Sequence, residues 1–551
     1  MNKYKYILIF IGFAILIMWK ALLPGYVLGL DMVFAPQMDV SPNLDGFLNS
    51  LPINYVIYWL GLIVPAWAVQ KIIFLALFSS IGYMAFKHLP LGEDKVARLF
   101  SALIYLVNPF VYSRFLAGQW AHLMAYAFLP LFVHCLLVFK EKNDLKSGLK
   151  LFGSLFLISI FSIHFFAMAS MLLVAWLPYC LMGKLVDSDW DKVKPLVRNI
   201  AICGGLFLII SSYWLIPAMD RTEPIEQRFD AAHWQAFSAG GYKNISPTLN
   251  LVSLNGFWGE RYVWAEHFAW PQDYAVFWIT LAFILSLVLI GLVTGIKNER
   301  TRNISIFFGI LGMLSLAFAS GAGETMFKDL NLWLYTHISF WSGFRDSQKF
   351  TGLLVLSYAF FAGLGLSNII DYLGAKKPTS KGPFLAVIFI IPIIFGYLVW
   401  GGFHGQIRPV WYPDAWFNAK KIIDADKSES KVLFLPWHGY MSLRFNNNII
   451  SANPAKRFFG EKIIESKSVE LGGIYNQEAN EEYLILDAVI RDDQMDSDKK
   501  IDFLKREYGI KYIIKVKDLE SVDNISYDFL FSPRMDKRQE NDEALVYEIK
   551  R

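Results

Sequence analysis

The sequence predicts a polytopic α-helical membrane protein of about 11 transmembrane helices, followed by a small α/β domain. Hydropathy is the first observation behind this prediction, because 55% of the 551 residues are hydrophobic and 16% are aromatic. The second is the placement of charge: the last 149 residues hold 49 of the chain's 100 charged residues. Residues 1–402 therefore lack the surface of a soluble enzyme, and their aromatic content excludes disorder. We expect one domain over residues 1–402 and another over 403–551.

Eleven segments are apolar enough to cross a bilayer core about 30 Å thick, which requires about 20 helical residues. These segments lie near residues 6–23, 66–86, 97–113, 119–139, 149–163, 165–182, 198–219, 273–296, 303–321, 350–373 and 383–402. The fifth and sixth could instead form one helix bent near residues 162–164, which would move the tail to the other side of the membrane. The first is interpreted as a retained anchor, because no small-residue cleavage site follows it.

Lysine and arginine placement orients the bundle. With the N-terminus inside, the inner segments carry 19 basic residues and the outer segments carry nine, as the positive-inside rule requires. We therefore expect a cell-membrane protein with a cytoplasmic N-terminus and an external C-terminal domain. The outer loops 24–65, 220–272 and 322–349 are long, which places the working surface outside. The net charge of +4 gives no reason to expect a nucleic-acid partner.

The tail alternates helical and strand patterns, which predicts a small mixed sheet. Helices are expected at Asp414–Asp424 and Ile501–Tyr508, the second ended by Gly509. The expected strands are Lys431–Pro436, Ile510–Val516 and Ala544–Ile549, the last of them at an edge of the sheet. A phosphate-binding glycine loop is absent from the sequence, so we interpret the tail as a lid or binding module.

Acidic residues mark the first outer loop. Asp31, Asp39 and Asp45 precede an amphipathic stretch, residues 54–65, that can lie along the membrane interface. A carboxylate held there could accept a proton from an acceptor hydroxyl or help to hold a divalent cation. The alternative is that these residues cap helices or solvate the loop.

Two basic residues lie at the outer end of a late span. Arg345 and Lys349 are four positions apart, so on a helix they would project from one face. Two cations at the membrane edge suit a phosphate or pyrophosphate. The alternative is contact with lipid headgroups by basic residues at a span end.

Polar groups near the membrane core form a third candidate set. Gln119 and His122 lie at the start of the fourth span, close to Asn108 and Arg114 at the end of the third, and His164 lies near the outer end of the fifth. Ionisable and amide groups at such depths are candidate functional residues. A turn between spans would itself need Asn, Pro and Gly, and His164 could be an ordinary hydrogen-bonded histidine.

The outer loop 220–272 is rich in tryptophan and polar residues. His233, Trp258, Glu260 and Trp264 could together form a sugar-binding surface, since aromatic rings beside carboxylates suit sugars. An interfacial aromatic belt would have the same composition.

Three of these segments carry a resemblance to a known family. Val64–Lys71, Tyr105–Leu131 and Phe344–Phe350 are similar to segments of the polyprenyl-phosphate arabinofuranosyltransferase branch of the GT-C superfamily of integral-membrane glycosyltransferases. Tyr508–Ile514 resembles the outer domain of related cell-envelope glycosyltransferases. The resemblance implies a GT-C-like bundle that transfers a sugar, with inversion, from a polyprenyl-phosphate donor. It assigns the base or metal contact to Asp31 first and Asp39 second, and donor-phosphate contacts to Arg345 and Lys349.

The leading hypothesis is therefore a membrane glycosyltransferase that uses a polyprenyl-phosphate-linked sugar and a glycan or glycolipid acceptor on the outer face. Its cofactor, if it has one, would be a divalent cation, Mg²⁺ or Mn²⁺, with Asp31 as a ligand. The first alternative is a non-catalytic membrane protein that handles lipid-linked glycans, as a flippase partner or scaffold. A transporter is the second, and the mostly charge-free spans disfavour it.

Overall fold

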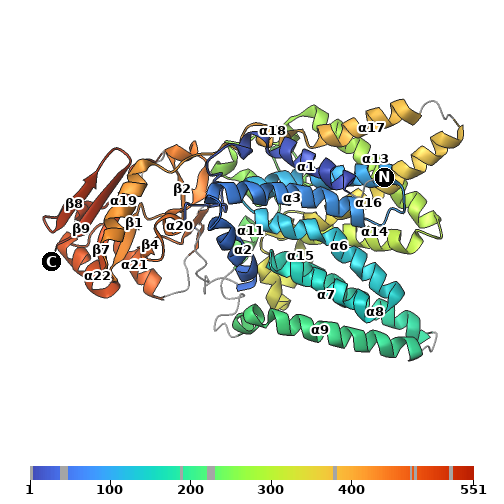
Figure 1. Ribbon diagram of the computed structural model, residues 1–551, viewed down its shortest axis with the longest axis horizontal. Helices are drawn as coiled ribbons and strands as arrows, with labels where there is room; N and C mark the ends of the chain where they lie inside the picture. The colour runs from blue at the N-terminus through green and yellow to red at the C-terminus, as the bar shows by residue number, and fades with distance from the viewer. Residues whose placement is uncertain are drawn as a thin grey trace.

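The computed structural model describes residues 4–37, 48–186, 190–219, 230–376, 381–471, 474–476, 481–519 and 525–550. A long helical bundle fills one end of the molecule and a small sheet domain the other (Figure 1). The bundle consists of α1 (Lys5–Met18), α3 (Ala66–His88), α4 (Lys95–Leu106), α5 (Pro109–Leu116), α6 (Trp120–Lys142), α7 (Leu145–Ser159), α8 (Ile163–Val186), α9 (Trp190–Met219), α13 (Ala275–Lys297), α14 (Arg302–Ala319), α16 (Thr351–Lys376) and α17 (Lys381–Phe395).

The predicted count of eleven spans is not confirmed. In the described part of the chain, eight helices are long and apolar enough to cross a membrane, and a ninth is possible if the bent pair Val387–Phe395 and Tyr397–His404 is one span. The difference comes from α7, which has only 15 residues, and from α8, whose apolar part Ile163–Pro178 also falls below the required length. Helices α7 and α8 are separate and pack against each other, so the chain reverses between them and does not continue as one bent helix.

A break in the third span builds part of the site. Asn108 ends α4 and begins α5: its side-chain oxygen accepts from the Val111 amide at 3.1 Å, and its nitrogen donates to the Ile104 carbonyl at 3.0 Å. Pro109 follows at the first helical position, where its missing N–H costs nothing. Because the side chain replaces the lost backbone bonds, the chain can bend here inside the membrane.

The connections that carry the candidate residues gather at the end of the bundle that faces the sheet domain (Figure 1). They contain α2 (Leu51–Gly61), α11 (Ala231–Ala236), α12 (Pro247–Val252), α15 (Lys328–His337) and the short 3₁₀ helices η1 (Trp19–Leu22), η2 (Leu48–Ser50), η3 (Trp258–Arg261), η4 (Val263–Ala265), η5 (Pro271–Asp273), η6 (Ser339–Phe344) and η7 (Ser347–Phe350). On the same side, η9 (Tyr397–Val399) and α18 (Trp400–His404) lead from the bundle to the tail.

The tail forms a five-stranded mixed sheet in the order β4-β1-β7-β9-β8. Strand β1 (Lys431–Leu435) pairs in parallel with β4 (Ile463–Ile464) and β7 (Ile510–Val516), while β9 (Ala544–Ile549) runs antiparallel to β7 and to β8 (Met535–Glu540). The prediction of β9 as an edge strand is wrong, because β8 lies outside it. Gly509 ends the preceding helix, α22 (Ser497–Tyr508), in the left-handed conformation, as predicted, with φ at +66°.

Helices and two hairpins complete this domain. The helices are α19 (Asp414–Ala425), α20 (Ala455–Phe459), α21 (Glu481–Arg491), α22 (Ser497–Tyr508) and the 3₁₀ helices η10 (Arg444–Asn446) and η11 (Asp528–Phe531). The hairpins are β2–β3 (Tyr440–Ser442 and Ile450–Ala452) and β5–β6 (Val469–Leu471 and Ile474–Asn476).

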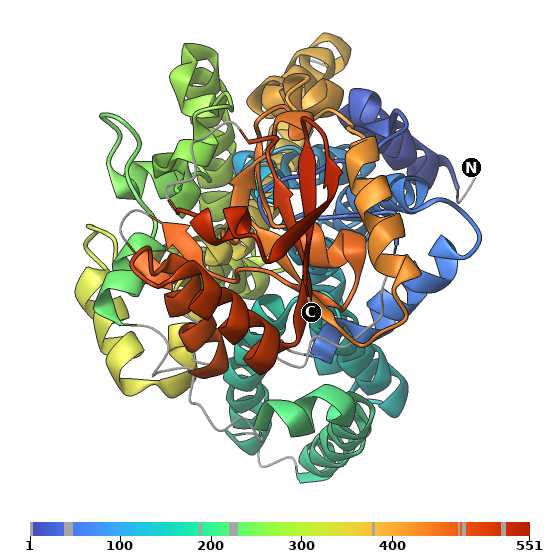
Figure 2. The ribbon, with the colours of Figure 1, turned by 90° about the vertical axis from the view of Figure 1, so that its left-hand side faces the viewer.

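The sheet domain is attached to the first outer loop through backbone contacts. Tyr26 and Val410 form an antiparallel bridge, and the Ala452 amide donates to the Leu30 carbonyl at 2.7 Å. The buried Tyr412 hydroxyl donates to the Phe34 carbonyl at 2.8 Å. Seen along the bundle, the domain covers the end where the outer loops meet (Figure 2).

Candidate active site

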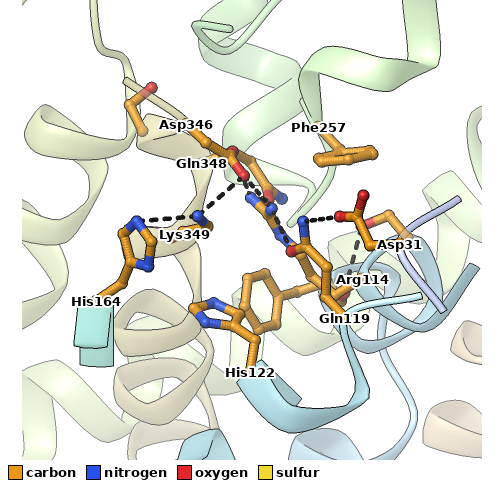
Figure 3. A network of polar contacts seen from close by, with 12 residues as sticks. Asp31, Arg114, Gln119, His122, His164, Phe257, Asp346, Gln348 and Lys349 are labelled. Carbon is orange, nitrogen blue, oxygen red and sulfur yellow. Dashed lines mark hydrogen bonds and ion pairs between the residues drawn. The ribbon is translucent and has the colours of Figure 1, made fainter. Parts of the chain in front are cut away.

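A buried arginine lies at the centre of a polar network between the bundle and its outer loops. Arg114, on α5, has no exposed surface. Its Nη1 and Nη2 donate to the two carboxylate oxygens of Asp346 at 2.5 and 2.9 Å, which is a bidentate pair. Its Nε and Nη2 also donate to Gln348 Oε1 at 3.0 and 2.5 Å. The guanidinium lies 4.6 Å from the centre of the Phe257 ring (Figure 3).

The network reaches Asp31 through Gln119. Arg114 Nη1 donates to Gln119 Oε1 at 2.9 Å, and Gln119 Nε2 donates to Asp31 Oδ2 at 3.1 Å. A second donor comes from the sheet domain: the Tyr440 hydroxyl is 3.0 Å from Asp31 Oδ1. Among the described residues, each carboxylate oxygen of Asp31 accepts from one donor, which orients it and leaves it a lone pair for a further partner.

Gly118 allows the Asp31 backbone to approach the turn between α5 and α6. The Asp31 amide donates to the Ala117 carbonyl at 3.0 Å. Gly118 has φ at +79°, and a Cβ there would lie 2.3 Å from the Met32 nitrogen and 2.8 Å from the Asp31 nitrogen. The predicted turn in this segment therefore also holds the backbone of Asp31 in position.

Asp31 combines access with low solvation. Its side chain is exposed, yet protein surrounds it closely enough that desolvation raises the pKa of its carboxyl, against the hydrogen bonds from Gln119 and Tyr440 and the charge of Lys349. A raised pKa makes this group a stronger base than an ordinary aspartate.

Lys349 lies near this carboxylate and Arg345 lies near its partner Tyr440, but the two cations are not on one helix face as predicted. Arg345 follows η6 and Lys349 lies in η7, with the non-helical Asp346 between them. Lys349 Nζ is 3.5 Å from Asp346 Oδ2 and 3.1 Å from His164 Nε2. Arg345 lies 4.5 Å from the centre of the Phe237 ring, and burial lowers its pKa to about 10, so it stays charged at neutral pH.

Asp346 is fully committed to the network. Burial alone would raise the pKa of its carboxyl, but the charges of Arg114 and Lys349 hold that pKa down, at about 2. The carboxylate is therefore ionised at physiological pH, and so low a pKa makes it a poor general base. In the structure it holds the side chains of Arg114 and Lys349 in place.

The two candidate histidines differ in their surroundings. His164, at the start of α8, lies 3.1 Å from the Gly343 carbonyl as well as from Lys349, so it belongs to the network. His122 packs its ring on Phe165 at 4.2 Å and bonds Ser162 through Nδ1 at 3.0 Å. Its ring also lies edge-on to that of His164, with 6.2 Å between the ring centres. His122 therefore borders the network, and its contacts favour a packing role.

The described part of loop 220–272 packs beneath Arg114 and Arg345 through aromatic rings. Its predicted sugar-contact residues are mostly buried. Trp258 packs on Phe237, the ring that contacts Arg345. Trp264 packs on Phe257, the ring that contacts Arg114. Both tryptophans are at least nine-tenths buried. His233 is bonded to Asp230 at 2.7 Å, within the cap of α11.

The buried Glu260 carboxylate stabilises this loop by accepting hydrogen bonds from it. Its Oε1 accepts from the amides of Gly256 and Phe257 at 2.9 and 3.0 Å, and its Oε2 accepts from Asn250 at 2.9 Å and Gln272 at 3.2 Å. With four donors on a buried carboxylate, a direct contact with sugar is disfavoured. A sugar-binding role for this set stays a prediction, and the geometry favours a structural one.

The described residues do not fit a divalent cation. They contain no group of three or more His, Cys, Asp or Glu that could hold one, and the second acid of the network, Asp346, is already paired with Arg114 and Lys349. Asp39 and Asp45 lie outside the described residues. A Mg²⁺ or Mn²⁺ ion on Asp31 stays a prediction that this donor set does not support.

Two members of the site carried no clear sequence signal. Asp346 lies between the two predicted cations, Arg345 and Lys349. An acid at that position, which can pair with a neighbouring cation, was the signal that could have identified it. Tyr440 is one of 26 tyrosines and lies 409 positions from Asp31. Only the folded chain shows that the two are in contact.

Solved structures share this architecture. The arabinofuranosyltransferase AftD from mycobacteria aligns over 100% of this chain with a TM-score of 0.63 and 13% identity. ArnT from Cupriavidus metallidurans aligns over 98% of this chain and 97% of its own in the apo state, and over 99% and 98% when bound to undecaprenyl phosphate. Both ArnT states give a TM-score of 0.51 at 12% identity. The chain has the GT-C fold.

The likeness to these structures confirms the predicted GT-C-like fold. At 12–13% identity, it shows a shared fold alone. No protein-family model and no curated protein sequence matches the chain. This chain spans 40% of the length of AftD, so the activity of that larger enzyme is not transferred by the likeness. The function has to be argued from the site.

Proposed function

We propose that this protein is a membrane glycosyltransferase that moves a sugar from a polyprenyl-phosphate donor to a hydroxyl of a glycan or glycolipid acceptor on the outer face. Asp31 is the general base. Lys349 and Arg345 hold the donor phosphate, and the Arg114–Asp346 pair keeps the cations and Gln119 in position.

One observation carries this proposal: an accessible, desolvated carboxylate faces the same part of the site as two cations. Lys349 is close enough to act on the pKa of Asp31, and Arg345 is close enough to act on that of Tyr440, the direct partner of Asp31. A base beside a phosphate site is the arrangement that transfer from a sugar phosphate requires.

The reaction follows from this arrangement. The acceptor hydroxyl gives its proton to Asp31, and its oxygen forms a bond to the anomeric carbon of the sugar. The bond between that carbon and the phosphate oxygen breaks, and its electron pair leaves with the lipid phosphate. Lys349 and Arg345 stabilise the negative charge of this leaving group.

A lipid-linked donor also fits the outside of the bundle. Helix α2 and the residues after it expose Tyr55, Trp59, Leu62 and Ile63 beside the site end of the bundle. Aromatic and aliphatic side chains of this kind lie in the interfacial region of membranes. The donor would enter from that leaflet with its phosphate towards Lys349.

The proposal is tested with the purified protein in lipid nanodiscs and a panel of radiolabelled polyprenyl-phosphate sugars. We expect the wild type to release lipid phosphate and transfer sugar. Asp31→Asn should lose turnover by a factor of about 100 or more, as expected for loss of a general base, while donor binding persists. Lys349→Met should instead weaken donor binding about tenfold or more, because a charge-assisted contact is lost.

Matched controls separate these effects from general damage. Asp414→Asn makes the same change at an exposed acid of α19, and Lys328→Met removes a lysine from a surface pair with Glu324. Both controls should behave like the wild type. Donor binding without turnover in the wild type, over a panel of acceptors, would support the non-catalytic alternative instead.

A further inference from the structure

The sheet domain reaches into the active site through the side chain of Tyr440. Tyr440 lies on β2, and its partner in the hairpin, Ala452 on β3, donates its amide to the carbonyl of Leu30, the residue before Asp31. The hairpin is thus fastened to the same turn of chain that presents the base. The Tyr440 hydroxyl then donates to Asp31 Oδ1 at 3.0 Å.

The hairpin is held rigidly in its own domain. Met441 and Leu443, on either side of Ser442, are at least nine-tenths buried, and Leu443 bridges to Leu519. The Gly439 carbonyl accepts from Asn453, and a Cβ on Gly439 would lie 2.2 Å from the Ser468 carbonyl oxygen. The position of the Tyr440 hydroxyl is therefore set by the fold of the domain.

The charges around Tyr440 keep its hydroxyl a donor. The Asp31 carboxylate raises the pKa of Tyr440 well above its usual value. Its proton therefore stays on the hydroxyl and points at the carboxylate. A donor fixed in this way favours the ionised form of Asp31, whose pKa desolvation raises.

We propose that Tyr440 is a positioning residue of the catalytic centre, through which the sheet domain orients Asp31 and keeps it ionised for the acceptor hydroxyl. The inference rests on the proposed function, and it gives the domain a part in catalysis beyond binding a glycan. Gln119 orients Oδ2 from the bundle and Tyr440 orients Oδ1 from the domain. The acceptor then finds the remaining lone pairs in a fixed direction.

The test compares the full-length wild type with Tyr440→Phe, which keeps the ring and removes only the hydroxyl. Transfer is measured as kcat and donor KM from pH 4 to pH 9. We expect kcat to fall about tenfold at neutral pH, the size of one charge-assisted hydrogen bond, while donor KM stays within about twofold because the phosphate contacts are intact. The acidic limb of kcat should move up by about one pH unit, which is a tenfold shift in the protonation equilibrium of the base.

The sign of this pH effect follows from the hydrogen bond. The hydroxyl lowers the pKa of Asp31, so its removal raises that pKa further. The base is then protonated over a wider acidic range, and activity is lost at higher pH than in the wild type. Tyr547→Phe, a change in the core of the sheet, should leave the profile unchanged.

A second measurement does not depend on turnover. The carboxyl signal of Asp31 is isolated by infrared difference spectroscopy against Asp31→Asn, and its titration is followed in both proteins. A higher pKa in Tyr440→Phe supports the inference. Equal pKa values, or a loss of donor binding and thermal stability together with activity, would overturn it. Absence of transfer in the wild type, with the pKa shift present, would instead defeat the proposed function and leave the contact established.

Discussion

Arg114 donates to Asp346, Gln348 and Gln119 from a position with no solvent contact. A buried ion pair of this kind adds little when compared with apolar residues, because both ions have lost their hydration. Breaking it is costly, since one charge is left buried without a partner. The pair is therefore better understood as a device for fixing positions than as a source of stability.

A double-mutant cycle tests this view of Arg114. Arg114→Met should lower the free energy of unfolding by ~3–5 kcal/mol, because it strands the Asp346 carboxylate. Arg114→Met combined with Asp346→Asn should cost less than the first change alone, measured by thermal unfolding in detergent. Costs that simply add would contradict the pairing. Arg534→Met, which breaks the half-exposed pair with Asp502, should change the free energy of unfolding by at most ~1 kcal/mol.

At the scale of elements, the turn from α5 to α6 has two structural roles. It redirects the chain after the broken third span, and it supplies Gly118, which admits the Asp31 backbone, and Gln119, which orients the Asp31 side chain. A single short segment thus connects the bundle to the first outer loop. Small changes in this turn are expected to move the base.

Gly118→Ala tests this connection. The new Cβ would collide with the Met32 and Asp31 backbone, so the first outer loop must shift. Turnover should fall about 100-fold, as expected when a catalytic group is displaced by about 1 Å, and kinetic assays of the purified variant measure it. Gly92→Ala is the matched control, because Gly92 also has a positive φ, +64°, but nothing lies within 4 Å of its Cβ position. Equal losses in the two variants would show that backbone strain, and not the collision, is the cause.

Element prediction succeeded where local chemistry decides the outcome. Strand β7 has the predicted bounds because Gly509 ends the preceding helix and a β-branched run follows it. The edge position of β9 was mispredicted because β8, Met535–Glu540, has a highly charged sequence that gives no strand signal. Sheet order depends on such distant pairings, which local patterns do not contain.

The site was predictable to a similar extent. Asp31, Lys349 and Arg345 were proposed as an acid of the first outer loop and two cations at the membrane edge, and their roles stay predictions. Their geometry was mispredicted, because η6 and η7 are 3₁₀ helices on either side of a break. The burial of Glu260, Trp258 and Trp264 was not predictable, since a loop composition does not tell which face of a tryptophan is covered.

At the scale of the whole molecule, the chain begins in the half of the bundle that is away from the sheet domain and ends in that domain (Figure 1). Together with the basic residues of the inner segments, this arrangement predicts an external sheet domain. Cysteines introduced in a cysteine-free protein test it on intact cells, with a maleimide that does not cross membranes. Asp414→Cys should be labelled, whereas Asn298→Cys, exposed between α13 and α14, should be labelled only after the cells are opened. The reverse pattern would invert the topology.

The contact between Asp31 and Tyr440 joins residues 409 positions apart. During synthesis, the first outer loop is complete long before the ribosome reaches the β2–β3 hairpin. In the proposed mechanism, the base would until then lack its partner from the sheet domain, and the nascent chain would hold an unfinished centre. Catalytic competence would then follow the folding of the sheet domain, so that incomplete chains would not consume an activated sugar.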